Sequence, residues 1–246
     1  MTNSNPPVDV QIFSDSQSAT EFAADWLVRQ LTSPGIWNVM LAGGNTPLSL
    51  YATVAARHAS LEHLTAFALD EYVGVPLNEP RNCANLIYER AIKPWGIRSE
   101  EYHSISSMEA DASTSIATHE EKINRAGGLD VVILGLGKNG HIGFNEPGSD
   151  AAVDGRLVPL SDVSINANRE WFGGDYAPLL GVTTGMKTIL AAKKILLLAF
   201  GPAKAAAITA MLEMPPSASC PASFLQTHPE TLIVLDQAAA ANLRHR

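Results

Sequence analysis

Short apolar runs alternate along this chain with longer stretches of helical periodicity, and this alternation is the feature that most constrains the fold. The expected strands cover residues 8–14, 37–42, 65–70, 129–135, 156–160, 193–200 and 231–236. The expected helices cover residues 16–32, 46–59, 82–92, 109–126, 183–191, 202–213 and 237–245. Strands that alternate with helices are typical of parallel sheets, because parallel neighbours need crossover connections. We therefore predict an α/β fold, an open and mainly parallel sheet with helices on both faces.

The chain length favours one domain. A chain of 246 residues, 46% hydrophobic and 17% charged, can bury one large core, and no linker-like stretch divides it. We expect a single domain over residues 1–246. Residues 143–182 are weakly patterned and rich in Gly, Asp and Asn. Long segments of this kind are usually functional loops, so we expect a lid within residues 150–182.

Charge and cysteine usage exclude several classes of partner. The net charge of -8 is spread along the chain, and the longest basic run is Lys193-Lys194, so no nucleic-acid footprint is present. Cys83 and Cys220 lack metal spacing and fit free thiols in a reducing compartment. The start MTNSNPPVDV does not read as a signal peptide, and apolar runs such as ILLLAF are too short to cross a bilayer. We expect a cytoplasmic protein that binds neither nucleic acid nor membrane.

The first candidate site follows the strand at 37–42. Gly43, Gly44, Asn45 and Thr46 lead into a helix whose first turn carries a proline. Two glycines let backbone N–H groups approach an anion, and the helix N-terminus adds partial positive charge. A phosphate cradle is one interpretation, and a plain turn capped by Thr46 is the other.

The second candidate site is TAFALDEYVGVP, residues 65–76, where an apolar strand runs into Asp70 and Glu71. Adjacent side chains of a strand point to opposite sides, so these two carboxylates cannot both face one substrate. We expect one of them to be structural. An acidic pair that only marks a solvated strand end is the alternative.

The third candidate site is ILGLGKNGHIGFNEPG, residues 133–148. Its GLGKNG matches the G-x-G-x-x-G pattern of a dinucleotide-binding turn, which requires a helix directly after the third glycine and an acidic residue about 20 positions on. Here Gly143, Pro147 and Gly148 interrupt any such helix. We therefore reject the dinucleotide interpretation.

Acid/base side chains remain on that loop: His141, Glu146, Asn139 and Asn145. Imidazole titrates near neutrality and moves protons in both directions, and a nearby carboxylate can orient it. We expect proton chemistry here. A histidine that only satisfies loop backbone groups is the alternative.

Together these stretches resemble a known family. LAGGNTPLSLY, ALDEYVGVP and LGLGKNGHIGFNEPG are similar to the phosphate turn, catalytic strand end and ring-opening loop of the glucosamine-6-phosphate deaminase (isomerase) family and its galactosamine-6-phosphate relatives. GVTTGMKTILAAKKILLLAFGPAKAAAI and PASFLQTHP extend the resemblance, which covers about residues 35 to 236. It implies the Rossmann-like fold shared with 6-phosphogluconolactonases. Those enzymes typically carry Arg after Asp-Glu and continue Gly-His-x-Ala-Ser-Leu-Phe, so DEY and GHIGFNEP favour the amino-sugar branch.

The resemblance implies catalytic roles for four residues. Asp70 is the expected base that moves a proton between carbon 2 and carbon 1 of the sugar. His141 is expected to open the pyranose ring, with Glu146 and Asn139 holding and tuning it. Some family members have Asp in place of Asn139, so the surroundings of His141 should be less anionic here. This route needs no metal or organic cofactor, and the chain lacks spacing such as H-x-x-x-H or C-x-x-C.

The resemblance also implies the phosphate site. The turn Gly43, Gly44, Asn45 and Thr46, together with Lys204 in AFGPAKA, matches phosphate-binding positions. The family usually carries a phosphate-binding Arg in the pattern Ala-Asn-x-Arg-aromatic-Phe, whereas this chain has Arg169 followed by Glu170. Either Arg169 acts from one position earlier, or binding relies on Lys204 and the turn. A glutamate would repel a phosphate dianion, so Glu170 must point away or the ligand differs.

The predicted function is isomerisation and deamination of a hexosamine 6-phosphate, with glucosamine 6-phosphate converted to fructose 6-phosphate and ammonia in amino-sugar catabolism. Galactosamine 6-phosphate is the nearest alternative substrate, and a 6-phosphogluconolactonase is the alternative enzyme. A non-catalytic effector domain of a sugar-responsive transcription regulator would require a helix-turn-helix, and only about 36 residues precede the first matched strand. Both a monomer and a homo-oligomer stay open.

Overall fold

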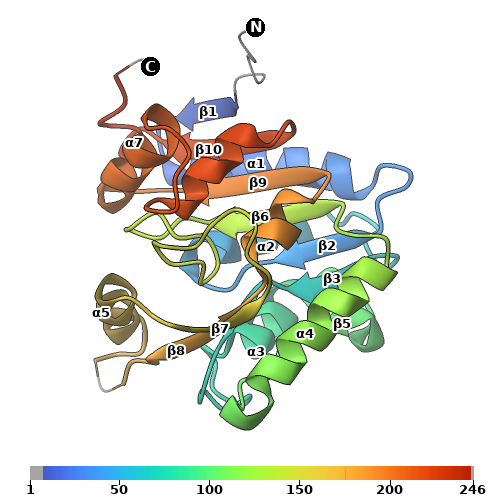
Figure 1. Cartoon of the computed structure of the whole chain (residues 1–246). Helices are drawn as coiled ribbons and strands as arrows, with labels where there is room; N and C mark the ends of the chain where they lie inside the picture. Colours follow the sequence, from blue (N-terminus) through green and yellow to red (C-terminus); the bar gives the residue numbers. More distant parts are fainter. Residues whose placement is uncertain (1–7, 175, 245–246) are drawn as a thin grey trace, which may run out of the picture.

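A seven-stranded parallel sheet forms the centre of the computed structural model, which describes residues 8–174 and 176–244 (Figure 1). All of its neighbouring strands pair in parallel. The strands in spatial order are β1 (Asp9–Phe13), β10 (Thr231–Asp236), β9 (Lys194–Ala199), β6 (Val131–Gly135), β2 (Asn38–Leu41), β3 (Thr65–Ala68) and β5 (Tyr102–His103). The predicted open, mainly parallel α/β sheet is confirmed.

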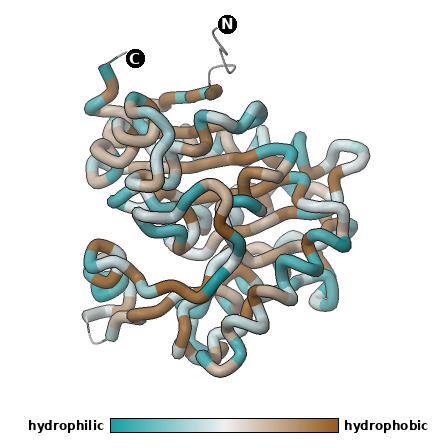
Figure 2. The backbone as a smooth tube through the Cα atoms, viewed as in Figure 1, coloured by the Kyte–Doolittle hydropathy of each residue, from teal (hydrophilic) through white to brown (hydrophobic). Residues whose placement is uncertain are grey.

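Helices cover both faces of this sheet, because successive strand residues point to opposite sides. Val131 and Ile133 of β6 enter one apolar core, whereas Val132 and Leu134 enter the other. The first core is closed by α1 (Ser16–Leu31), α2 (Asn45–Ala55) and α3 (Cys83–Ile87). The second is closed by α4 (Glu109–Arg125), α6 (Met186–Leu190) and α7 (Ala205–Glu213). Figure 2 shows the apolar strands running between these helices.

Shorter helical pieces complete the connections. They are a π-helix at Tyr88–Ile92, directly after α3, and 3₁₀ turns at Ser99–Glu101, Pro202–Lys204 and Pro221–Thr227. Among the described residues, no helix has the length and apolar character that a membrane crossing requires.

A small antiparallel sheet lies beside the parallel one (Figure 1). Its strands, in order, are β4 (Asp70–Tyr72), β8 (Leu180–Thr183) and β7 (Arg156–Pro159), and α5 (Asp162–Trp171) connects β7 to β8. We call β4, β7, α5 and β8 together the α5 layer. It takes part in two small apolar clusters. Phe144, Val158 and Leu160 form the first, with Tyr72 and Ile165 packed against them. In the second, Leu157 of β7 and Leu180 and Val182 of β8 pack with Ala112 and Ile116 of α4.

The strand order reverses between β2 and β6, which are neighbours in the parallel sheet. From β2 the chain continues to β3 on one side, and from β6 it reaches β9 on the other. Loops that leave in opposite directions open a crevice at the carboxyl ends of such strands, where ligands bind in open α/β sheets. The 43–46 turn and the 136–141 loop both begin there.

The expectation of an irregular segment at 143–182 is wrong in part, because α5 and β8 form within it. The buried side chains of α5 are Ser164 and Asn168, so its inner face is polar and hydrophobic periodicity does not reveal the helix. The helix expected at 183–191 begins only at Met186, because Leu180–Thr183 pairs with two strands as β8. The strands β4 and β5 were also not expected.

The helix expected at 237–245 is not formed in its described part, where residues 237–242 make turns and residue 245 lies outside the described residues. The Asp236 carboxylate accepts from the Ala239 N–H (2.8 Å) and from the Gly201 N–H (3.0 Å). A segment of this length is a marginal helix in isolation, so such tertiary contacts decide its conformation. Residues 1–7, where we expect no signal peptide, also lie outside the described residues.

Candidate active site

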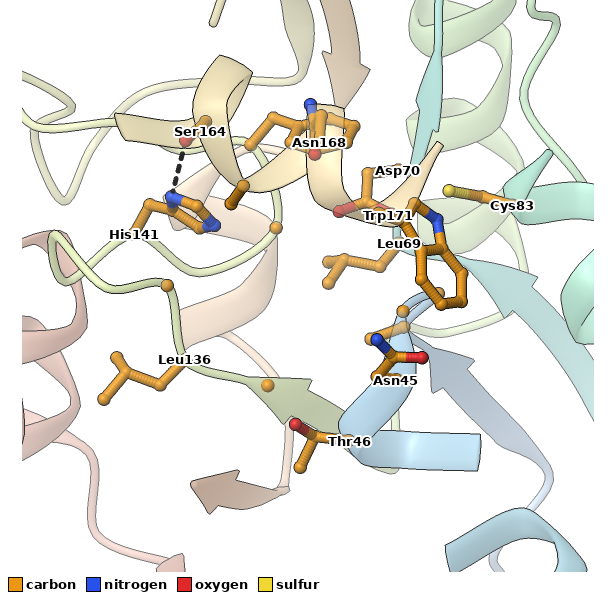
Figure 3. Close-up of a pocket in the computed structure, with 18 of the residues that line it drawn as sticks. Asn45, Thr46, Leu69, Asp70, Cys83, Leu136, His141, Ser164, Asn168 and Trp171 are labelled. Carbon is orange, nitrogen blue, oxygen red and sulfur yellow. Dashed lines mark hydrogen bonds between the residues drawn. The ribbon is translucent and has the colours of Figure 1, made fainter. Parts of the chain in front are cut away.

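A cavity of about 250 Å³ opens at the strand-order reversal, and all three candidate sites of the sequence border it. Asn45 and Thr46 come from the start of α2, Asp70 follows β3, and His141 comes from the loop after β6. Figure 3 shows Asp70 and His141 on opposite sides of the cavity, with Asn45 and Thr46 below them. The parallel sheet therefore gathers side chains that are far apart in the sequence.

Asp70 and Glu71 face different surroundings, as the alternation of a strand requires. Asp70 is 7% exposed and borders the cavity. Glu71 is 1% exposed and accepts backbone N–H groups from Tyr72 (2.7 Å), Cys83 (3.0 Å) and Ala84 (2.8 Å). Glu71 thus fixes the start of α3, and Asp70 is the carboxylate available to a ligand.

Burial raises the pKa of Asp70 to about 7, and the negative charge of Glu71 adds to this rise. Burial also raises the pKa of Glu71 to about 7, against the backbone N–H groups that favour its charged form. A carboxyl group with a pKa near neutrality can both take and return a proton at physiological pH. Asp70 therefore has the electrostatics of a general base.

His141, Glu146 and Asn139 form one contact group. Nδ1 of His141 lies 3.4 Å from Oε2 of Glu146, and Asn139 Nδ2 donates to that same oxygen (2.7 Å). Asn139 Oδ1 accepts from the His141 backbone N–H (3.2 Å). Burial alone would raise the pKa of Glu146, but the hydrogen bond and charge of His141, with Ser164 and Asn139, lower it to about 2. Glu146 is therefore an anion that orients His141.

Two glycines of GLGKNG leave the space that the His141 ring and its loop occupy. A Cβ added at Gly137 would lie 2.4 to 2.5 Å from three atoms of the His141 ring, so the imidazole rests directly on the Gly137 backbone. Gly140 has a φ of 85°, which L side chains rarely adopt, and an added Cβ there would meet Cys220 Sγ at 2.5 Å. The loop after β6 thus places His141 and does not begin a helix.

Two serines of α5 reach the same group. Ser161 is the N-cap of α5, and its Oγ accepts from Asn139 Nδ2 (3.0 Å). Ser164, 4% exposed, donates through Oγ to Glu146 Oε1, and this Oγ lies 3.2 Å from His141 Nδ1 (Figure 3). The α5 layer is therefore bonded directly to the histidine and glutamate.

The turn at 43–46 presents the start of α2 to the cavity. Gly44 is the N-cap with a φ of 94°, and no side chain caps the helix, so the alternative of a turn capped by Thr46 is not formed. A Cβ at Gly43 would lie 2.9 Å from Cys83 Sγ, so the chain passes closely over α3. Uncapped N–H groups at a helix start attract an anion.

Lysine side chains supply positive charge to the cavity. Lys204 borders it and donates through Nζ to the Leu136 carbonyl (2.5 Å). Burial, followed by the charge of Lys138, lowers the pKa of Lys204, and Lys138 borders the same cavity. Arg169 is exposed and does not border the cavity, and Glu170 is also exposed. The structure thus brings Lys204 and the turn together and leaves Arg169 outside.

Sequence reasoning missed five residues that build this site: Ser161, Ser164, Tyr72, Trp171 and Lys138. Ser161 before a helical segment is a helix start signal that could have revealed α5 and its serines. Tyr72 donates through its hydroxyl to Asn168 Oδ1 (2.9 Å), and Trp171 borders the cavity. No sequence signal predicts the place of Tyr72 or Trp171 at the site, because the hydrogen bond between Tyr72 and Asn168 joins segments about 100 residues apart.

Within residues 8–174 and 176–244, no group of three or more His, Cys, Asp or Glu side chains is arranged to hold a metal.

Comparison with known proteins extends over nearly the whole chain. The model of the family described as glucosamine-6-phosphate isomerases/6-phosphogluconolactonase matches residues 14–234. The chain is 39% identical over 241 residues to a glucosamine-6-phosphate deaminase of Shewanella loihica, and 39% identical over 241 residues to one of Cutibacterium acnes. These alignments cover 96% of this chain and 90% and 92% of the two relatives.

Solved structures agree in architecture. A monomeric glucosamine-6-phosphate deaminase superposes with a TM-score of 0.91 at 28% identity, covering 95% of this chain and 99% of that one. The 6-phosphogluconolactonase from Trypanosoma cruzi superposes with a TM-score of 0.80 at 20% identity, covering 98% of each chain, which demonstrates a shared fold alone. The chain belongs to the glucosamine-6-phosphate isomerase/6-phosphogluconolactonase family.

Proposed function

We propose that this protein is a glucosamine-6-phosphate deaminase, which isomerises and deaminates glucosamine 6-phosphate to fructose 6-phosphate and ammonia. The observation that carries this proposal is the pairing of Asp70 and His141 across one cavity, with Glu146 behind the histidine. The relatives of that name, 39% identical over 96% of the chain, support the same activity. The chemistry is a proton-transfer sequence that places the enzyme in amino-sugar catabolism.

His141 opens the sugar ring in this proposal. It accepts the proton of the anomeric hydroxyl, the bond between carbon 1 and the ring oxygen breaks, and the proton passes to the ring oxygen. Glu146 stabilises the transient positive charge on the imidazole, and Asn139 holds Glu146 in place. The products are an open-chain aldehyde and a histidine restored to its starting state.

Asp70 then isomerises the open-chain sugar. The carbonyl at carbon 1 acidifies the proton on carbon 2. The Asp70 carboxylate removes this proton while the carbonyl oxygen takes a proton from the ammonium group of the substrate, which gives an enolamine. Return of the proton to carbon 1 leaves an imine at carbon 2, which water hydrolyses with loss of ammonia. A pKa of about 7 suits Asp70 to both transfers.

The sugar phosphate binds at the opposite end of the cavity. The uncapped start of α2, at Gly43, Gly44, Asn45 and Thr46, offers N–H groups, and Lys204 adds a positive charge. Arg169 lies outside the cavity in this structure, so we assign phosphate binding to Lys204 and the turn. We infer a lid within residues 150–182 on a single domain, since α5 borders the cavity above His141 and Trp171 borders it on the side of Asp70 (Figure 3).

The experiment that tests this function is incubation of the purified chain with glucosamine 6-phosphate and, separately, galactosamine 6-phosphate. We expect stoichiometric ammonia and fructose 6-phosphate from the first. Preferential release from the galactosamine compound would reassign the substrate. Hydrolysis of 6-phosphogluconolactone without ammonia release from either amino sugar would overturn the proposal.

Two accompanying properties are inferred with the activity. We place the enzyme in the cytoplasm, because Cys83 and Cys220 are both buried free thiols. Monomer and homo-oligomer stay open, and light scattering of the purified chain distinguishes them.

A further inference from the structure

A closed ring of hydrogen bonds joins α5 to the loop after β6. Asn139 Nδ2 donates to Ser161 Oγ (3.0 Å), and Ser161 Oγ donates to Ser164 Oγ (3.2 Å). Ser164 Oγ donates to Glu146 Oε1, and Asn139 Nδ2 also donates to Glu146 Oε2 (2.7 Å). Two members come from the loop and two from the first turn of α5, so the ring exists only while α5 lies against the loop.

Two members of the ring determine which nitrogen of His141 carries a proton, because Glu146 Oε2 (3.4 Å) and Ser164 Oγ (3.2 Å) both face Nδ1, and the Glu146 carboxylate can only accept. A serine hydroxyl has one proton to donate, and that of Ser164 is committed to Glu146. The contact of 3.2 Å between Ser164 Oγ and His141 Nδ1 must therefore have the histidine as donor. Neutral His141 then carries its proton on Nδ1 and leaves Nε2 free as an acceptor, which Figure 3 shows on the side of the ring away from Ser164.

Burial makes this arrangement sensitive to the position of α5. Ser164 is 4% exposed, so water has little access to replace its hydroxyl. The helix is held from its other end by the Tyr72 hydroxyl, which donates to Asn168 Oδ1 (2.9 Å). A shift of α5 away from the loop would withdraw a donor from Glu146 and an acceptor from His141 at once.

We propose that Ser164 is a positioning residue for ring opening, which seats Glu146 and, together with it, favours the Nδ1–H tautomer of His141 while α5 lies against the loop. This rests on the proposed deaminase activity. Proton balance is kept, because Nε2 takes the anomeric proton and returns it to the ring oxygen. Ser164 does not exchange its own proton with the sugar.

The test compares Ser164→Ala with Ser164→Thr and with Asn166→Ala, an exposed residue of the same helix. We expect Ser164→Ala to lower kcat by about tenfold or more, and Ser164→Thr to restore it to within about threefold. Affinity for 2-amino-2-deoxyglucitol 6-phosphate, an open-chain analogue that bypasses ring opening, should change by less than about twofold. Asn166→Ala should match the wild type.

Nuclear magnetic resonance on ¹⁵N-histidine-labelled protein reads the tautomer directly, with His141→Gln to assign the signal. We expect Nδ1–H in the wild type and in Ser164→Thr, and a larger share of the Nε2–H tautomer in Ser164→Ala, where Glu146 alone faces Nδ1. An unchanged tautomer, or analogue affinity that falls in parallel with kcat, would overturn the positioning role. Since the tautomer is read without turnover, a wild type that releases no ammonia would contradict the deaminase proposal separately.

A second inference rests on charge at the cavity. Lys138 and Lys204 both border it, and their mutual repulsion contributes to the lowered pKa of Lys204. Lys138 Nζ lies 4.0 Å from Oε2 of Glu170 on α5, with the two side chains 43% and 80% exposed. An exposed ion pair at this distance contributes little binding free energy. A ligand with two negative charges can therefore take Lys138 away from Glu170.

We infer that Lys138 is a second cation for the phosphate monoester of the ligand, held near the cavity by Glu170 until that anion arrives. This inference also rests on the proposed activity, but its test uses inorganic phosphate and calorimetry and needs no turnover. We expect Lys138→Met to weaken phosphate binding by about tenfold and Glu170→Gln to change it by less than about threefold. Lys187→Met removes a lysine that pairs with Asp154 outside the cavity and should have no effect.

The same variants measured with glucosamine 6-phosphate should show the Lys138 effect in KM and leave kcat within about twofold. Unchanged phosphate affinity in Lys138→Met, or an equal loss in Lys187→Met, would overturn the role of Lys138.

Discussion

The parallel sheet and the α5 layer are held together in different ways. Strands of the parallel sheet send alternate apolar side chains into two large cores, and Ile133 and Leu197 at its centre are fully buried. The α5 layer takes part in two small apolar clusters, one of them shared with α4, and its helix turns Ser164 and Asn168 inward. Regions with few buried apolar contacts open at lower free energy than cores. Most of the stability is therefore expected to lie in the parallel sheet, and α5 is expected to open at a lower free energy than the sheet.

The two regions meet at the proposed base. Only Leu69 separates β3 of the parallel sheet from β4 of the α5 layer, and Asp70 is the first residue of β4. The Leu69 carbonyl accepts from the Thr184 N–H (2.9 Å), which ties β8 to the same point. Asp70 thus lies at the junction of the two sheets, whereas Ser164 reaches the site from α5.

Asp70→Asn should produce the largest effect and separate activity from stability. Loss of the base should lower kcat by about 10² to 10⁴-fold, while substrate affinity stays within a few fold. The measurements are ammonia release and exchange of the carbon 2 proton with solvent. Exchange at the wild-type rate would remove Asp70 from its role. Asn166→Ala serves as the active control.

Leu197→Ala should lower the free energy of unfolding without changing kcat. Leu197 is fully buried between β6 and β10, so the truncation should cost about 2 to 5 kcal/mol of unfolding free energy. Denaturant unfolding measures this loss, and kcat per folded molecule should not change. Leu179→Ala, in which the side chain is 62% exposed, should cost less than about 0.5 kcal/mol. Equal losses in the two variants would contradict the comparison.

The pH dependence of stability should follow the buried carboxyl groups. The pKa of Asp70 is about 7 in the folded protein, against an ordinary value of 3.8. Between about pH 4 and pH 7 the folded state therefore holds a proton on Asp70 that the unfolded state has lost. Stability therefore falls as pH rises from about 4 to about 7 through this group. His119 acts oppositely, since burial lowers its pKa from 6.5 to about 4.

The difference between Asp70→Asn and the wild type isolates the Asp70 contribution. The melting temperature of Asp70→Asn relative to the wild type should rise between about pH 4 and pH 7 and level off above about pH 7. A constant difference over that interval would contradict the raised pKa of Asp70.

Tyr72→Phe should have the smallest effect and should be confined to the α5 layer. It leaves Asn168 Oδ1 without its donor, while Asn168 Nδ2 already lacks a partner among the described residues. The expected cost is about 1 kcal/mol. Hydrogen exchange should accelerate in α5 and β8 but not in β6 or β9, and Tyr176→Phe, an exposed tyrosine, should change neither. Faster exchange throughout the sheet would show that the two regions open as one.

The sequence predicted six of the seven strands of the parallel sheet, because most of them carry a strong apolar pattern. The two-residue strand β5 was missed, and the strand expected at 156–160 pairs in the antiparallel sheet as β7. The strands at 129–135 and 231–236 and the helix at 16–32 recur with nearly the same bounds. Strand alternation alone indicated that Glu71 and Asp70 have separate roles, and their contacts agree. The helix α5 escaped detection because its buried positions are polar, and the alanines after Asp236 do not form the helix that their propensity favours.

Local sequence patterns were sufficient to predict the order of most strands and helices, the absence of a helix directly after His141, and the family motifs. These features depend on apolar periodicity and on the positions of glycine and proline. Only the tertiary structure decided that Gly137 makes room for an imidazole, that Ser164 joins Glu146 and His141, and that Arg169 lies outside the cavity. Those relations involve side-chain directions and contacts between distant segments. No local pattern encodes them, since they arise only when the strand order brings the loops to one crevice.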